Sequence, residues 1–392
     1  MKSFSYFSPT KVVFGSDALD HLAAELAVYS PKKILVLYGS GSVIKSGVLD
    51  KVTAALDAAK YDYIKIGGVQ PNPLLSFAVD TIAKSQEAGV DFVLSVGGGS
   101  VIDTGKAVAI GLANPGEDIW PFWLREKTPT VALPHANVLT ISAAGSETSQ
   151  SAVLTNTENS CKRGLSSDLN RPKFAILNPE FTYTLPKYQV AAGVVDIFMH
   201  TMDRYFAISE SNDMTDEIAE GLMRVVFKYG KTAVEDPTNY QAMSELMWAG
   251  SLSHVGLTGL GSPGDWTPHQ MSHELSGYYD ATHGAALACT WNAFANTTYE
   301  ECPERFAQFA RKVHGLEGDD VAIAKQAIDA TVAYFKSLEM PVTISELIGR
   351  TLAEDELIEL ADACSFRKTR KVGTLKEIGY EGILAAYAYI NK

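Results

Sequence analysis

Short apolar segments alternate with helical segments in the first half of the chain, and this alternation constrains the fold more strongly than any other feature. We expect strands at residues 11–14, 34–38, 63–66, 92–96, 130–133, 138–141 and 174–177. Helical patterns fall between several of them, at residues 18–27, 43–59, 75–88 and 101–112. Strands that alternate with helices predict a mostly parallel, Rossmann-like sheet with helices on both faces.

The segment before this alternation has a different pattern. Residues 4–7 and 11–14, with Pro9 between them, predict a two-stranded piece outside the main rhythm. An exposed edge at this place needs cover, and a partner subunit is one way to provide it.

The strand pattern ends at Pro186. Helical periodicity then covers residues 188–206, 213–235, 239–255, 265–277, 285–296, 304–314, 320–338, 352–363 and 375–390. We therefore predict an α/β domain at residues 1–187, followed by an all-helical domain at residues 188–392.

Composition narrows the class of protein. A chain of 392 residues exceeds what one hydrophobic core usually supports, which agrees with two domains. The net charge of −13 argues against a nucleic-acid partner. No apolar run reaches the length of a membrane span, and the first residues lack the apolar core of a signal peptide. The 4 cysteines show no C-x-x-C spacing, so we expect reduced thiols in a cytoplasmic protein.

Two pairs of chemically active side chains repeat a four-residue spacing in the helical half. Asp196 and His200 form the first pair, His269 and His273 the second, and His283 follows the second helical segment. Residues four apart project from one face of a helix. A carboxylate with imidazoles suits a divalent ion such as Zn²⁺ or Fe²⁺. The alternative is that these histidines are ordinary residues of two helices, with their hydrogen bonds satisfied by neighbouring groups of the protein.

A triple glycine in the first half indicates a phosphate ligand. Gly97, Gly98, Gly99 and Ser100 join an expected strand to an expected helix, which places bare amide groups at a positive helix end. The motif differs from the ordinary Rossmann fingerprint, because Ile102 replaces the third glycine. It also lacks the Gly-Lys-Ser/Thr ending of a Walker A loop. A tight turn without a ligand is the alternative.

A second glycine turn bears on the choice of coenzyme. Gly39, Ser40 and Ser42 follow another expected strand, with Lys45 close behind and no acidic residue between positions 37 and 47. NAD-selective sites place an acidic side chain near the adenosine ribose. Small hydroxyls and a lysine suit a 2′-phosphate instead, so we expect NADP(H) in preference to NAD(H). The alternative here is a surface loop that binds nothing.

These motifs together resemble one family. Gly-Gly-Gly-Ser-x-x-Asp-x-x-Lys at 97–106, Gly-Ser-Glu at 145–147, Asp-x-x-x-His at 196–200 and His-x-x-x-His-x(9)-His at 269–283 are similar to the iron-containing, or group III, alcohol dehydrogenases. The resemblance covers essentially the whole chain and implies that residues 1–187 are the dinucleotide-binding domain and residues 188–392 the metal-binding domain. It is strongest to the NADPH-dependent butanol dehydrogenase and broad aldehyde reductase branch. The run 142–144, Ser-Ala-Ala, departs from the more usual threonine- and glycine-rich sequence.

The resemblance implies a dehydroquinate-synthase-like fold and a specific set of site residues. The implied ligands of one divalent ion are Asp196, His200, His269 and His283. His273 matches an additional histidine near the nicotinamide, either as a proton relay or as a neutral group that orients its neighbours. The predicted cofactor contacts are Gly39, Ser40, Ser42, Asn72, Gly97, Gly98, Gly99, Ser100, Asp103, Thr140, Ser149, Lys162 and Leu177.

The implied activity is a metal-dependent, NADP(H)-linked interconversion of primary alcohols and aldehydes, by a homodimer acting on small molecules. A metalloprotease is excluded, because H-E-x-x-H would need histidine where the chain has Gly277. Two rivals remain: a polyol (glycerol-type) dehydrogenase or dehydroquinate-synthase-like lyase of the same fold, and a non-catalytic nucleotide- or metal-binding protein.

Overall fold

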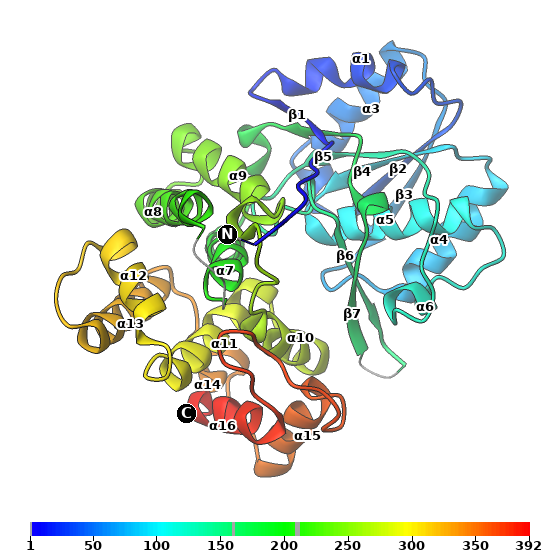
Figure 1. Ribbon diagram of the computed structural model, residues 1–392. Helices are drawn as coiled ribbons and strands as arrows, with labels where there is room; N and C mark the ends of the chain where they lie inside the picture. Colours follow the sequence, from blue (N-terminus) through cyan, green and yellow to red (C-terminus); the bar gives the residue numbers. More distant parts are fainter. Residues whose placement is uncertain (1, 159–160, 208–211) are drawn as a thin grey trace. The chain divides into compact units, whose positions relative to one another are not determined.

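A computed structural model describes residues 2–158, 161–207 and 212–392 (Figure 1). The chain divides into two compact units. One comprises Phe7–Leu185 and Pro237–Met247; the other comprises Met1–Tyr6, Pro186–Asp236 and Trp248–Lys392. We call them the α/β unit and the helical unit. Within the described residues, no helix combines the length and apolar character that a bilayer-spanning segment requires.

The α/β unit is built on one parallel sheet of six strands. Their order is β1-β8-β5-β4-β2-β3, and every neighbouring pair runs parallel. The strands are β1 (Lys11–Phe14), β2 (Ile34–Gly39), β3 (Tyr63–Val69), β4 (Phe92–Gly97), β5 (His135–Leu139) and β8 (Phe174–Leu177). The helices and helical turns of this part of the chain are η1 (Ala18–His21), α1 (Leu22–Ala27), α2 (Ser42–Lys45), α3 (Val48–Ala58), α4 (Leu75–Glu87), α5 (Gly99–Ala113), α6 (Trp120–Trp123), η2 (Asp168–Asn170) and η3 (Pro179–Thr182).

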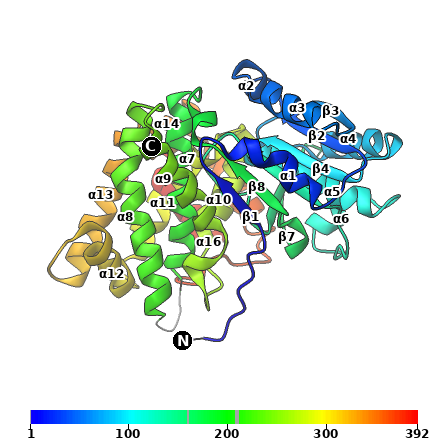
Figure 2. The ribbon, with the colours of Figure 1, turned by 90° about the horizontal axis from the view of Figure 1, so that it is seen from above.

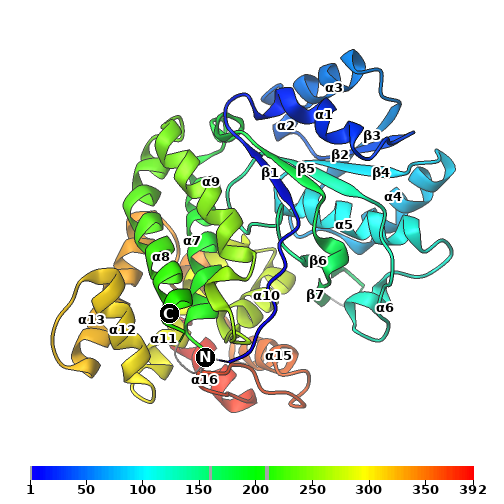
Figure 3. The ribbon, with the colours of Figure 1, turned by 45° about the horizontal axis from the view of Figure 1, so that its top comes forward.

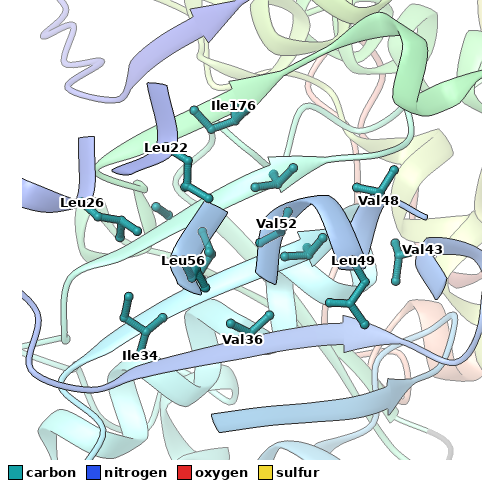
Figure 4. Close-up of a cluster of buried hydrophobic side chains, with 14 of the residues drawn as sticks. Leu22, Leu26, Ile34, Val36, Val43, Val48, Leu49, Val52, Leu56 and Ile176 are labelled. Atoms are coloured by element: carbon teal, nitrogen blue, oxygen red, sulfur yellow. The ribbon is translucent and has the colours of Figure 1, made fainter. Parts of the chain in front are cut away.

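Burial on both faces explains why these strands are almost uniformly apolar. In β2, Ile34 and Val36 face a core shared with α1 and α3, where Leu22, Leu26, Val52 and Leu56 pack against them (Figure 4). Leu35 and Leu37 belong to a second core with residues of α5 on the opposite face. Because successive side chains of a strand point to opposite faces, both faces need apolar residues. The predicted fold class is therefore confirmed for this unit.

Several details of the sheet differ from the sequence predictions. The strand expected at 130–133 is absent, and the one expected at 138–141 lies earlier, as β5. The two-stranded piece at 4–7 and 11–14 was wrong as well: β1 joins the main sheet beside β8 (Figure 2), and residues 4–7 form no strand. A hairpin of β6 (Ser151–Asn156) and β7 (Cys161–Ser166) was missed. One expected helix is two, α2 and α3, because Gly47 adopts φ 74° between them.

The helical unit contains helices throughout, in agreement with the sequence. They are α7 (Lys187–Tyr205), α8 (Asp213–Glu235), α10 (Thr267–Tyr279), α11 (His283–Thr298), α12 (Pro303–His314), α13 (Asp320–Ser337), α14 (Ile344–Ile348), α15 (Glu354–Cys364) and α16 (Tyr380–Ile390), with a short turn, η4 (Leu257–Gly259). Helix α9 (Tyr240–His254) contributes residues to both units. Figure 3 shows α12 and α13 side by side, as their extensive contacts indicate.

Helix α7 is the central element of this unit. Nearly every residue from Val190 to Tyr205 is buried, so the helix has no solvated face along most of its length. It packs against α8 and α11. A separate apolar core joins α10, α11, α15 and α16 through Met271, Cys289, Leu360 and Tyr387. Polar side chains on α7 are consequently held in a rigid, desolvated environment.

Candidate metal and nucleotide sites

Helix α7 presents Asp196 and His200 on one face, one turn apart. Both side chains are buried, at 5% exposure each. His200 Nε2 lies 3.4 Å from Asp196 Oδ1, and the helix geometry alone accounts for this proximity.

Helix α10 brings His269 to the same place. One potential ligand atom from each of Asp196, His200 and His269 lies within 4.8 Å of the others. The centres of the His200 and His269 rings are 4.5 Å apart. Three side chains separated by up to 73 positions in the sequence therefore converge in one buried cluster, which we call the histidine cluster.

His283, the fourth predicted ligand, stands at the edge of this cluster. It is the first residue of α11, and its Nε2 lies 3.9 Å from Asp196 Oδ1. Its side chain is more exposed than the other three, at 24%. The close approach of α11 to α7 depends on Gly284, whose added Cβ would meet the carbonyl oxygen of Ala192 at 2.0 Å.

The donors of the cluster fit a divalent ion. His200 Nδ1 and His269 Nε2 are buried ring nitrogens without a hydrogen-bond partner among the described residues. Leaving a buried polar atom unsatisfied costs about 1–3 kcal/mol, and a coordinated cation removes that cost. Burial lowers the pKa of His200 well below its usual value, and the neighbouring His254 lowers it further. A neutral imidazole is the form that binds metals.

Several residues around the cluster were missed by the sequence predictions. Asp203 Oδ2 lies 2.5 Å from His269 Nδ1, and the His254 ring stacks on His200 with centres 3.9 Å apart. Arg204, which was also missed, places its guanidinium 4.6 Å above the Trp266 ring. Asp203 was predictable in principle, since it lies seven residues after Asp196 on the same helix face. His254 gave no such signal, because α9 carries no other ligand-type residue at helical spacing.

His273 lies next to the cluster but outside its tightest part. Its ring centre is 5.5 Å from that of His283 and 6.5 Å from that of His269. It is partly exposed, one turn after His269 on α10. This position separates it from the three clustered donors.

Several of the predicted cofactor residues lie at the carboxyl ends of strands of the parallel sheet. Gly39 ends β2, Gly97 ends β4, Leu177 ends β8, and Thr140 follows β5 directly. Because the strands are parallel, these carboxyl ends share one edge. β2 and β4 are neighbours in the middle of the sheet. From β2 the chain continues to β3 on the side away from β4, whereas from β4 it continues to β5 on the side away from β2. Ligands of open α/β sheets bind at such a switch point.

The glycine turn after β4 has the geometry of a phosphate cradle. Gly98 precedes α5, a helix of 15 residues whose first amide groups are free of intrahelical partners. A Cβ on Gly98 would come within 2.2 Å of Ile141 Cγ2, so only glycine fits there. The turn after β2 places Ser40 and Ser42 in exposed positions.

Buried polar contacts hold the segment after β5 against α5. Lys106 is fully buried, and its Nζ donates to Ser146 Oγ at 2.8 Å and to the Ser151 carbonyl at 2.6 Å. Burial lowers its pKa to about 8. Asp103 accepts from Ser146 Oγ at 2.5 Å and from the Val153 amide at 2.9 Å, so both of its oxygens are bonded within the protein.

The other predicted contacts occupy varied environments. Lys162, on β7, donates to Asn72 Oδ1 at 2.9 Å, which brings two of the predicted residues together. Ser149 is buried, and its hydroxyl accepts from Lys106 at 3.3 Å. Thr140 is buried next to β4, with its amide bonded to the Gly97 carbonyl.

Comparison with known proteins identifies the family of the chain. The model of the iron-containing alcohol dehydrogenase family matches residues 9–179, and the C-terminal model of the same family matches residues 190–390. NADH-dependent butanol dehydrogenase A of Clostridium acetobutylicum is 38% identical over 390 residues, covering 99% of both chains. NADPH-dependent aldehyde reductase YqhD of Escherichia coli is 36% identical over 351 residues, covering 88% of this chain and 89% of that protein.

A solved structure extends the similarity to three dimensions. The crystal structure of NADH-dependent butanol dehydrogenase A from Thermotoga maritima has a TM-score of 0.95 at 33% identity, covering 100% of this chain and 99% of the other. The chain belongs to the iron-containing alcohol dehydrogenase family. Within that family it lies in the branch of butanol dehydrogenases and aldehyde reductases, and it is an oxidoreductase of alcohols and aldehydes.

Proposed function

We propose that the protein is a metal-dependent, NADP(H)-linked oxidoreductase that interconverts primary alcohols and aldehydes, with butanol and butanal as typical substrates. The observation that carries this proposal is the histidine cluster, with three buried donors within 4.8 Å in a chain of this family. Asp196, His200 and His269 hold one Fe²⁺ or Zn²⁺ ion, and His283 completes the set. When bound, the ion supplies Lewis acidity toward the substrate oxygen, and the nicotinamide supplies or accepts the hydride.

The side chains around the cluster have separate tasks in this proposal. The buried α7 residues exclude water and keep the donors rigid, which strengthens electrostatic interactions at the reacting oxygen. His273, partly exposed and one turn from His269, moves a proton to or from the substrate oxygen. The amides at the start of α5 bind the pyrophosphate of the coenzyme. Asn72 and Lys162, which are hydrogen-bonded to each other, bind another part of the coenzyme.

The preference for NADP(H) rests on the turn after β2. Ser40 and Ser42 are exposed, Lys45 follows on α2, and the first acidic residue after the turn is Asp50, in the first turn of α3. Hydroxyl groups and a lysine suit a 2′-phosphate, whereas an acidic side chain would repel it. The similar proteins include both NADH- and NADPH-dependent enzymes, so the preference is argued from the residues of this turn.

We further propose a cytoplasmic homodimer formed through the N-terminal edge. β1 is an outermost strand of the sheet. Phe4, Tyr6 and Phe7 expose 46%, 45% and 55% of their surface, and exposed apolar side chains that lie close together are typical of protein–protein contact surfaces. Light scattering of the purified protein tests the dimer, and a monomeric mass would contradict it.

The central experiment combines elemental analysis with coenzyme oxidation. We expect one divalent ion per chain and butanal-dependent oxidation of NADPH that is faster than that of NADH. Asp196→Ala and His200→Ala should lose the ion and turnover while retaining the helical circular dichroism spectrum. His21→Ala, which removes an exposed histidine of the α/β unit, is the matched control and should behave as wild type. Full activity of the Asp196→Ala protein after chelation would refute the metal assignment.

A further inference from the structure

Asp203 extends the ligand face of α7 by one turn. It lies three residues after His200, and its side chain is almost fully buried, at 2% exposure. Its Oδ2 atom lies 2.5 Å from Nδ1 of His269, which is buried as well, at 4% exposure. The two residues belong to different helices, α7 and α10, so this contact is tertiary.

The contact determines which nitrogen of His269 faces the cluster. A carboxylate oxygen accepts hydrogen bonds, so Nδ1 carries the hydrogen and donates a hydrogen bond to Asp203 Oδ2. In a neutral imidazole the other nitrogen, Nε2, then holds the lone pair. Nε2 is the ring atom that is buried without a hydrogen-bond partner within the described part of the chain. The geometry therefore leaves Nε2 as the donor to an ion.

We propose that Asp203 is a positioning residue of the metal centre, which fixes the tautomer and the ring orientation of His269 through its hydrogen bond to Nδ1. The inference rests on the proposed metal function of the histidine cluster. Carboxylates that orient metal-binding histidines in this way raise the basicity of the ligand and hold its ring in place.

A purely structural role for the carboxylate is a poorer explanation. The backbone carbonyl of Asp203 already accepts the Asp265 amide at 2.6 Å, which links the end of α7 to the segment just before α10. The side chain is not needed for that link. Burying a carboxylate carries a desolvation penalty, and its close hydrogen-bond partner here is a ring of the histidine cluster.

The test measures affinity for Zn²⁺ by competition with a fluorescent chelator, together with the visible absorption of the Co²⁺-loaded protein. Asp203→Asn has the same shape and keeps an acceptor, whereas Asp203→Ala removes the hydrogen bond altogether. We expect Zn²⁺ affinity to fall about 10- to 100-fold in Asp203→Ala and by less in Asp203→Asn, with an altered Co²⁺ spectrum. Glu220→Gln is the matched control, since Glu220 is buried and bonded to Tyr205 and Gln308 instead of a cluster histidine.

The outcomes separate this inference from the proposed function. Wild-type Zn²⁺ affinity and Co²⁺ spectra in both Asp203 variants would overturn the role of Asp203 while leaving the metal centre intact. An equal loss of affinity in Glu220→Gln would also overturn it, because general destabilisation would then explain the effect. Absence of Zn²⁺ binding by the wild-type protein would instead refute the metal centre itself. Weaker binding in the Asp203 variants alone, with unchanged thermal unfolding of the metal-free proteins, supports the proposal.

Discussion

Replacing Gly284 with alanine should force α11 away from α7 and disturb the histidine cluster from outside it. The new Cβ would lie 2.0 Å from the carbonyl oxygen of Ala192 and 2.7 Å from its carbonyl carbon, whereas real Cβ contacts are essentially never shorter than 3.0 Å. The obstacle is backbone, so the helices must separate by roughly 1 Å. Ligand distances in a metal site tolerate only about 0.2 Å, and His283 immediately precedes Gly284.

The size of the effect on stability follows from two opposing terms. Overpacking of this kind costs on the order of 3 kcal/mol, whereas alanine is favoured over glycine in a helix by about 1 kcal/mol. We therefore expect a net loss of about 2 kcal/mol, or about 4–8 °C in Tm for a unit of this size. Zn²⁺ affinity and turnover should fall together with it.

The assay is thermal unfolding of the metal-free protein, followed by chelator competition for Zn²⁺. Gly221→Ala in α8 is the matched control, because its Cβ would meet only the flexible end of Arg224, at 3.7 Å. That variant should be slightly stabilised and bind metal as wild type does. If Gly284→Ala behaves like Gly221→Ala in both measurements, the close approach of α11 to α7 is not what positions His283.

Three further predictions follow from other parts of the molecule. Ser40→Asp should shift the ratio of kcat/KM values from NADPH toward NADH, since a carboxylate repels a 2′-phosphate; an unchanged ratio would count against the assignment of the β2 turn. His273→Ala should keep its metal but lose about 10²–10⁴ in kcat together with one inflection of the pH–rate profile, and a simple rise in KM would favour an orienting role. Burial lowers the pKa of His135 to about 4, so between pH 6.5 and 4 the unfolded chain takes up a proton that the folded protein does not. As the pH is lowered through this window, the free energy of unfolding should fall by up to about 3 kcal/mol. Urea unfolding of His135→Gln should show a correspondingly weaker dependence of that free energy on pH.

The fold was largely predictable because its local signals agree with its tertiary environment. Strands such as β2 and β4 are buried on both faces, so their continuous apolar runs are visible in the sequence. The hairpin of β6 and β7 was missed because Ser151–Asn156 and Cys161–Ser166 mix polar and apolar residues without regular alternation. Residues 130–133 have strand-like composition, but no neighbouring strand pairs with them, and pairing is a tertiary property.

The site was predictable to a different degree in its two parts. Asp196 and His200 share a helix, so their spacing alone indicates their proximity. Bringing His269 to them requires the packing of α10 near α7, and here the likeness to a family supplied what spacing could not. The Asp203 contact to His269 joins residues 66 positions apart, and no periodicity in one sequence reports such a contact.

The division of the chain into two units separates two kinds of selectivity. All five residues that we assign to the ion and its proton transfer lie in the helical unit, whereas the serines and glycines assigned to the coenzyme lie in the α/β unit. A substitution at Ser40 can therefore alter which coenzyme is preferred without touching a single donor to the ion. On this assignment, coenzyme preference and ion binding depend on different parts of the chain and can change independently of each other.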